Sequence, residues 1–145
     1  MTDTLSKWFP WLLLAPAVVP LLYIEGLLYP FVTPKTLLFR GLFIVASAPF
    51  AYLALSGREF YFTRLLNRYT WMPGGLLIVT YLTSLVGLDF YHSFWSIFDR
   101  GDGLLTLTSA VFFFYFILLY AGREFLQKLF SVAAWVGSLV ALYAF

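Results

Sequence analysis

The chain has 145 residues, of which 62% are hydrophobic and only 11% are charged, and its mean hydropathy is +0.88. Soluble domains carry about 25% charged residues, so the composition excludes an ordinary water-soluble globule, and it excludes a disordered chain, which would be polar. The net charge of +2 is too small for a nucleic-acid-binding surface. The chain has no cysteine and one histidine, His92, so we expect neither a metal nor another cofactor. The class that remains is an integral membrane protein.

Charged residues divide the chain into uncharged stretches of about the 20 residues that a spanning helix needs. Apolar runs such as 111–120 have no polar face, unlike the strands of a membrane barrel, and must satisfy their backbone within a helix. We therefore predict one all-α transmembrane domain, a polytopic helical bundle that covers residues 1–145. Its five expected spans lie at about 8–28, 37–56, 70–88, 103–121 and 129–145.

The basic residues orient these spans. With the N-terminus in the cytoplasm, six basic residues lie inside and three, namely Lys35, Arg40 and Arg100, lie outside. This arrangement places the loop 89–103 and the C-terminus on the outer face.

The first span could also be a signal peptide, because Lys7 precedes an apolar run that contains Ala15-Pro16-Ala17. The apolar stretch before that site is shorter than usual, so we interpret it as an uncleaved helix. Its prolines, at positions 10, 16, 20 and 30, predict a bent helix packed against its neighbours.

Three polar residues lie near the outer ends of the first two spans. Glu25 either lines a polar cavity or is an interfacial residue that pairs with Lys35 or Arg40. Lys35 and Arg40 either bind phosphate on the outer face or act as snorkelling anchors.

The inner connection 56–71 alternates aromatic and aliphatic residues with Arg58, Arg64 and Arg68. Such a pattern suits a basic amphipathic segment on anionic headgroups. A loop that only sets the topology is the simpler interpretation.

The outer loop 89–103 combines five aromatic residues with His92 and the cluster Asp99-Arg100-Gly101-Asp102-Gly103. The aromatic residues predict a membrane-interface belt or a short interfacial helix. In a functional interpretation Arg100 holds a phosphate, His92 is available as an acid or base, and Glu25, His92, Asp99 and Asp102 line a polar cavity. In a structural interpretation Arg100 pairs with Asp99 or Asp102 at the start of the next helix.

The last span carries small residues, and Gly137 and Ala141 have the spacing that permits close helix packing. No charged flank follows Phe145, so we expect the chain to be the N-terminal portion of a longer protein.

Two stretches resemble one family. Residues Tyr29–Arg40, YPFVTPKTLLFR, are similar to the start of the second span in bacterial O-antigen ligase-like membrane proteins. Residues Thr83–Leu105, TSLVGLDFYHSFWSIFDRGDGLL, resemble the outer loop of the same family through Ser93-Phe94-Trp95 and Asp99-Arg100-Gly101-Asp102-Gly103.

The resemblance implies a GT-C-type glycosyltransferase of the bacterial cytoplasmic (inner) membrane. Such proteins ligate or polymerise cell-surface polysaccharide from undecaprenyl pyrophosphate carriers. The family has about twice as many spans and keeps its catalytic residues in the second half of the chain, which the present sequence lacks. His92 does not match the family's catalytic histidine. Arg100, and with it Arg40 and Lys35, would lie near the pyrophosphate.

The sequence also leaves other functions open. The chain could be a non-enzymatic scaffold or accessory subunit of a membrane complex. A small transporter or flippase fits less well, because only the first span is rich in proline and no second half repeats it. In each case the lipid bilayer is a partner, and we expect no catalysis from these 145 residues alone.

Overall fold

The computed structural model describes residues 2–23, 25, 32–56, 60–96 and 103–143. This part of the chain is helical and contains no β-strand, which confirms the predicted all-α class. The α-helices are α1 (Thr2–Leu14), α2 (Thr33–Leu55), α3 (Met72–Val86), α4 (Phe90–Trp95), α5 (Leu104–Tyr120) and α6 (Arg123–Tyr143). Three 3-10 helices join them, namely η1 (Ala15–Leu21), η2 (Phe62–Leu66) and η3 (Arg68–Trp71).

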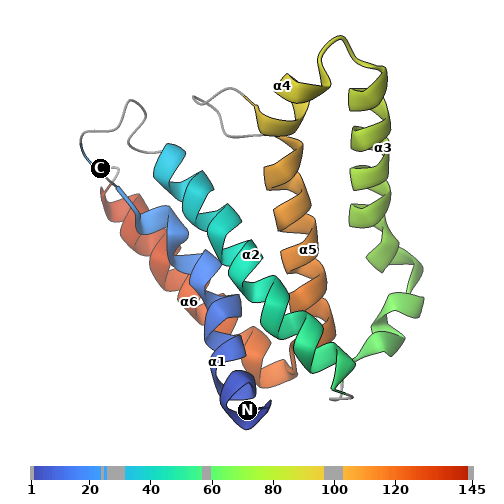
Figure 1. Ribbon diagram of the computed structural model, residues 1–145. Coiled ribbons are helices and arrows are strands. Elements are labelled where there is room, and N and C mark those ends of the chain that lie inside the picture. Colours follow the sequence, from blue (N-terminus) through green and yellow to red (C-terminus); the bar gives the residue numbers. More distant parts are fainter. Residues whose placement is uncertain (1, 24, 26–31, 57–59, 97–102, 144–145) are drawn as a thin grey trace.

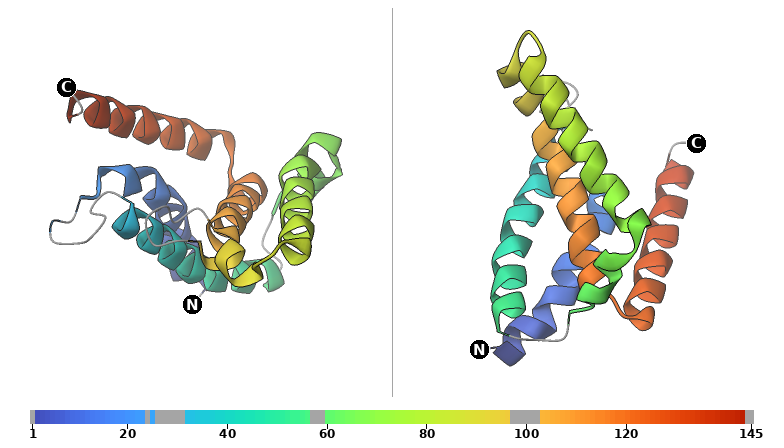
Figure 2. Two further views of the ribbon diagram at one scale, coloured as in Figure 1. Left: turned by 90° about the horizontal axis from the view of Figure 1, so that it is seen from above. Right: turned by 90° about the vertical axis from the view of Figure 1, so that its right-hand side faces the viewer.

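The long elements run side by side and alternate in direction along the chain (Figure 1). α1 and η1 run up in this view, α2 runs down, α3 up, α5 down and α6 up, with the short α4 lying across the top of α5. In space, α5 packs between α2 and α3, α2 also packs on α1, and α6 packs on η1 and α1 (Figure 2). We call the two ends of this assembly the α4 end and the Arg64 end, after α4 and a residue described below.

The first predicted span changes helix type partway. α1 ends at Leu14, and the chain continues as a 3-10 helix through Leu21. Pro16 and Pro20 have no backbone N–H, so neither can donate the hydrogen bond that an α-helix needs at its position. The α-helix therefore gives way to a 3-10 helix in the proline-rich part of the span, and the predicted bend stays a prediction.

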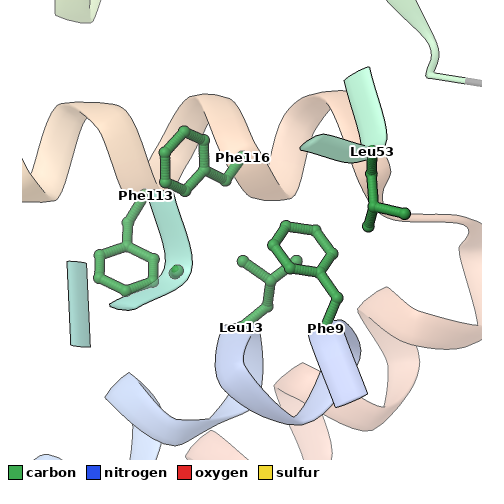
Figure 3. Packing of buried hydrophobic residues seen from close by; sticks show 6 residues of the cluster. Phe9, Leu13, Leu53, Phe113 and Phe116 are labelled. Atoms are coloured by element: carbon green, nitrogen blue, oxygen red, sulfur yellow. The ribbon is translucent and has the colours of Figure 1, made fainter. Parts of the chain in front are cut away.

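Aromatic side chains form the core where α1, α2 and α5 meet (Figure 3). Phe50 of α2 stacks on Phe116 of α5, with ring centroids 4.2 Å apart. Phe9 of α1 meets Tyr120 of α5 edge to face at 4.8 Å, and Leu13 lies fully buried one turn further along α1. Such aromatic pairs each contribute about 0.5–1.5 kcal/mol beyond the burial of their surface.

Arg64 fixes the C-terminal end of α5. Its Nη1 donates to the carbonyl oxygens of Leu118 and Ala121, both at 2.7 Å, and the backbone N–H of Tyr61 donates to the Leu119 carbonyl at 2.9 Å. These carbonyls belong to the last turn of a helix, where intrahelical donors are missing and the helix dipole favours a cation. Arg64 therefore ties the segment between α2 and α3 to α5.

Polar contacts also join α3 and the segment before it to α5. The Tyr115 hydroxyl donates to the Thr70 carbonyl at 3.0 Å, and the hydroxyls of Tyr81 and Thr108 lie 2.9 Å apart. Gly74 permits this approach, because a Cβ atom there would lie 2.7 Å from the Tyr115 hydroxyl oxygen. Hydrogen bonds of this kind are a common means of joining helices in lipid.

Two helices, α2 and α6, are long and apolar enough to cross a membrane, and the shorter α5 is also apolar. Only 11% of the most apolar window of α2 and 6% of that of α6 is buried, whereas the core helix of a soluble protein would be mostly buried. Large apolar side chains such as Ile44, Val86 and Trp135 are exposed instead. This surface supports a membrane protein whose helices face lipid.

The other expected features of the bundle stay predictions. α3 and α5 begin and end within two residues of the expected spans, and α2 within four. α1 and α6 each begin six residues earlier than expected, and η1 ends at Leu21. Gly137 and Ala141 are exposed on α6, and a Cβ at Gly137 would meet nothing within 4 Å. Neither residue therefore packs closely on another helix among the described residues.

Replacing Arg64 by Gln should destabilise the protein by about 2 kcal/mol, because two carbonyls in the last turn of α5 lose a charged donor. Unfolding of the purified protein in detergent, followed by circular dichroism, measures this loss. The matched control is Arg68→Gln, since Arg68 is exposed and contacts only its neighbour Tyr69 among the described residues. Equal stability of the two variants would contradict the capping role of Arg64.

Candidate functional site

Arg40 connects three elements at the α4 end. It lies two turns into α2, half-buried, and its Nε donates to the Thr106 hydroxyl at 2.9 Å. Its Nη2 lies 3.5 Å from the carbonyl oxygen of Trp95, the last residue of α4. A guanidinium group is therefore held where α2, the end of α4 and the start of α5 come together.

A close backbone contact between Gly103 and the end of α4 also holds this junction together. Gly103, the residue before α5, is buried against the end of α4, and a Cβ there would lie 2.5 Å from the Phe94 carbonyl oxygen. Ser96 follows α4 with a φ of 64°, a left-handed conformation that non-glycine residues rarely adopt. The turn at Ser96 and the small residue at 103 together let α4 lie against the start of α5.

Asp89 and His92 form a pair at the start of α4. The Asp89 side chain caps the helix by accepting the backbone N–H of His92 at 3.1 Å, and its Oδ2 lies 2.6 Å from His92 Nδ1. The hydrogen bond from the His92 backbone N–H, followed by that from its side chain, lowers the pKa of the Asp89 carboxyl group. This pairing orients the imidazole and leaves Nε2 as the ring nitrogen for any further proton transfer.

The remaining predicted site residues are placed as follows. Lys35 lies half-buried in the first turns of α2, where it has an interaction partner, on the same helix as Arg40. Glu25 is exposed beyond the end of η1. Asp99, Arg100 and Asp102 lie outside the described residues, so the predicted cavity with Glu25 and His92 stays a prediction. Gly103, the residue after Asp102, is the next residue that the structure describes.

The sequence interpretation missed three residues that organise this end, namely Asp89, Thr106 and Gly103. Asp89 had a recognisable signal. An aspartate just before a helix commonly caps it by accepting the backbone N–H of the residue three positions later, which here is His92. Thr106 had none, since nothing in the sequence links it to Arg40, 66 residues away. Gly103 was noticed only as part of the charged cluster.

The described residues contain no group of three or more acidic, histidine or cysteine side chains that could hold a metal ion. The chain matches no protein-family model, no curated protein and no solved structure. What the geometry itself defines is a helical protein with membrane-length apolar helices and a fixed cation at the α4 end.

Replacing Gly103 by Ala should cost about 1–3 kcal/mol, because the added methyl group overlaps the Phe94 carbonyl and forces α4 away from α5. Thermal unfolding in detergent measures this cost. Gly137→Ala is the matched control, with open space at its Cβ and an expected gain of about 0.5–1 kcal/mol from helix propensity. If Gly103→Ala is as stable as Gly137→Ala, the close contact is not present.

The cap at Asp89 should make α4 sensitive to acid. Because the pKa of Asp89 is lowered in the folded protein, its stabilisation of α4 is present above the ordinary value of 3.8 and is lost as the pH falls through the folded-state value. The Asp89 carboxyl carbon, followed by NMR in detergent micelles, should titrate with a midpoint below 3.8. His92→Ala should raise this midpoint. A midpoint at or above 3.8 in the unmodified protein would contradict the cap.

Proposed function

We propose that the chain is the membrane-embedded part of a lipid-linked glycan transferase similar to the bacterial O-antigen ligases. The observation that carries the proposal is the contact of Arg40 with Trp95 and Thr106. The contact with Trp95 joins Arg40, the last residue of the first stretch of the family resemblance, to the second stretch, 83–105. Arg40 and Trp95, 55 residues apart in sequence, thus meet at a cation, as a substrate site shared by the two stretches would need.

The proposed topology has five spans in the bacterial cytoplasmic membrane, with the Arg64 end in the cytoplasm and the α4 end outside. Three further stretches add to the two membrane-length helices. α1 with η1 is about 33 Å long and η3 with α3 about 30 Å, close to the roughly 30 Å of a bilayer core. α5 is shorter, about 26 Å. α1 and α6 run in the same direction, which supports an odd number of crossings (Figure 1).

In this proposal the α4 end binds the pyrophosphate of an undecaprenyl-linked glycan. Arg40 is the fixed cation, and Lys35 on the same helix and Arg100 beyond α4 supply two more positive charges. Guanidinium groups match the geometry of phosphate oxygens and stabilise the charge that develops on a departing pyrophosphate. The residues that complete the transfer would come from the second half of the family pattern.

Binding of undecaprenyl pyrophosphate to the full chain in lipid nanodiscs tests the proposal. Arg40→Gln and Arg100→Gln should each weaken binding about tenfold, the cost of losing one charged hydrogen bond. Arg40→Lys should lose less, because it keeps the charge. Arg123→Gln is the control, since it makes the same charge change at the Arg64 end, where α6 begins.

Undiminished binding by both Arg40→Gln and Arg100→Gln, with their thermal stability intact, would overturn the proposed site and favour an accessory subunit. The second measurement is glycan transfer in cells that express Arg100→Ala from the natural gene. Transfer at the normal rate would exclude a role for Arg100 in the reaction.

A further inference from the structure

The segment from residue 60 to Met72, which contains η2 and η3, forms a shelf at the Arg64 end of α5. One side of the shelf is fixed to α5 through Arg64, Tyr61 and Thr70, as described above. Phe60 inserts into the aromatic core, 5.1 Å from Phe50 between ring centroids. The shelf therefore has a defined position before it meets any partner.

The other side of the shelf is exposed and mostly apolar. Leu66 is 85% exposed, and large side chains on the same segment are exposed with it, namely Phe62, Tyr69, Trp71 and Met72. The indole N–H of Trp71 donates to the Leu65 carbonyl at 2.7 Å, so the ring has its polar edge satisfied within the shelf. Aromatic residues of this kind prefer the boundary between acyl chains and headgroups.

Arg68 is the cation of this exposed side. Its guanidinium carbon lies 5.0 Å from the centroid of the Tyr69 ring, and its Nη2 donates to the Tyr69 hydroxyl at 3.1 Å. Within the described part of the chain no carboxylate forms an ion pair with it. Arg64, only four residues earlier, already donates twice to helix carbonyls. Arg64 therefore has its Nη1 donors occupied by the helix, whereas the exposed Arg68 can donate hydrogen bonds to a ligand.

We propose that the shelf binds the phosphate headgroup of an anionic phospholipid, with Arg68 on the phosphate and the aromatic side chains at the headgroup boundary. Charge complementarity favours this occupant, because the shelf carries Arg64 and Arg68 and no acidic residue. A basic surface of this kind attracts anionic lipid by about 1 kcal/mol for each cation near the membrane. The inference does not depend on the proposed glycan transfer.

The test is native mass spectrometry of the full chain released from nanodiscs that contain phosphatidylcholine with a minor fraction of phosphatidylglycerol. The unmodified protein should retain phosphatidylglycerol in preference to phosphatidylcholine. Arg68→Gln should lower this preference about fivefold, with an unchanged circular dichroism spectrum and unfolding temperature. Arg123→Gln should change it less than twofold, because α6 does not contact η2 or η3.

Three results would overturn the proposal. Equal losses in the two variants would mean that the protein attracts anionic lipid only through its net charge. No loss in Arg68→Gln would exclude Arg68 as the ligand. A dimer that persists in pure phosphatidylcholine and dissociates in Arg68→Gln would assign the shelf to a second copy of the chain.

Discussion

Burial of α5 is the constraint on which most of the structure depends. Most of this helix is buried or half-buried, whereas Phe112 and Phe114 are exposed. Its buried side chains are Leu104, Ser109, Val111, Phe113, Phe116 and Leu119. α1 and α2 pack on its aromatic side, α3 packs on another, and α4 and η2 meet its two ends. α6 packs mainly on η1 and α1, and its Phe125 meets Tyr120 of α5. An all-round apolar sequence such as 111–120 can serve as this centre only because its neighbours also offer apolar surfaces.

The ends of α5 then determine where the polar groups lie. At its C-terminal end, carbonyls that lack an intrahelical donor accept hydrogen bonds from Arg64. These bonds fix the position of the shelf. At its N-terminal end, Gly103 admits the backbone of α4, and Thr106 accepts Arg40. A single helix thus positions a cation at each end, and both proposed sites derive from it.

The two sites differ in what surrounds their cations. Arg40 is half-buried between helices and held by a hydroxyl and a carbonyl, so it can present a fixed charge to a ligand that enters from the α4 end. Arg68 is exposed beside an aromatic ring, and in the proposed topology it lies where headgroups and water meet. A long lipid carrier suits the first environment, and the headgroups of bulk lipids suit the second.

The sequence alone determined the helical class and, within a few residues, the bounds of α2, α3 and α5, because charge spacing and apolar runs are local signals. It offered the short aromatic helix after Asp89 as one of two alternatives. It also identified Arg40, Lys35 and His92 as candidates. It did not determine that Arg40 meets Thr106, or that Arg64 caps α5 while Arg68 stays exposed. Those outcomes depend on which carbonyls lack a donor and which side chains meet across 50 residues or more. Only the packing of the helices around α5 decides that.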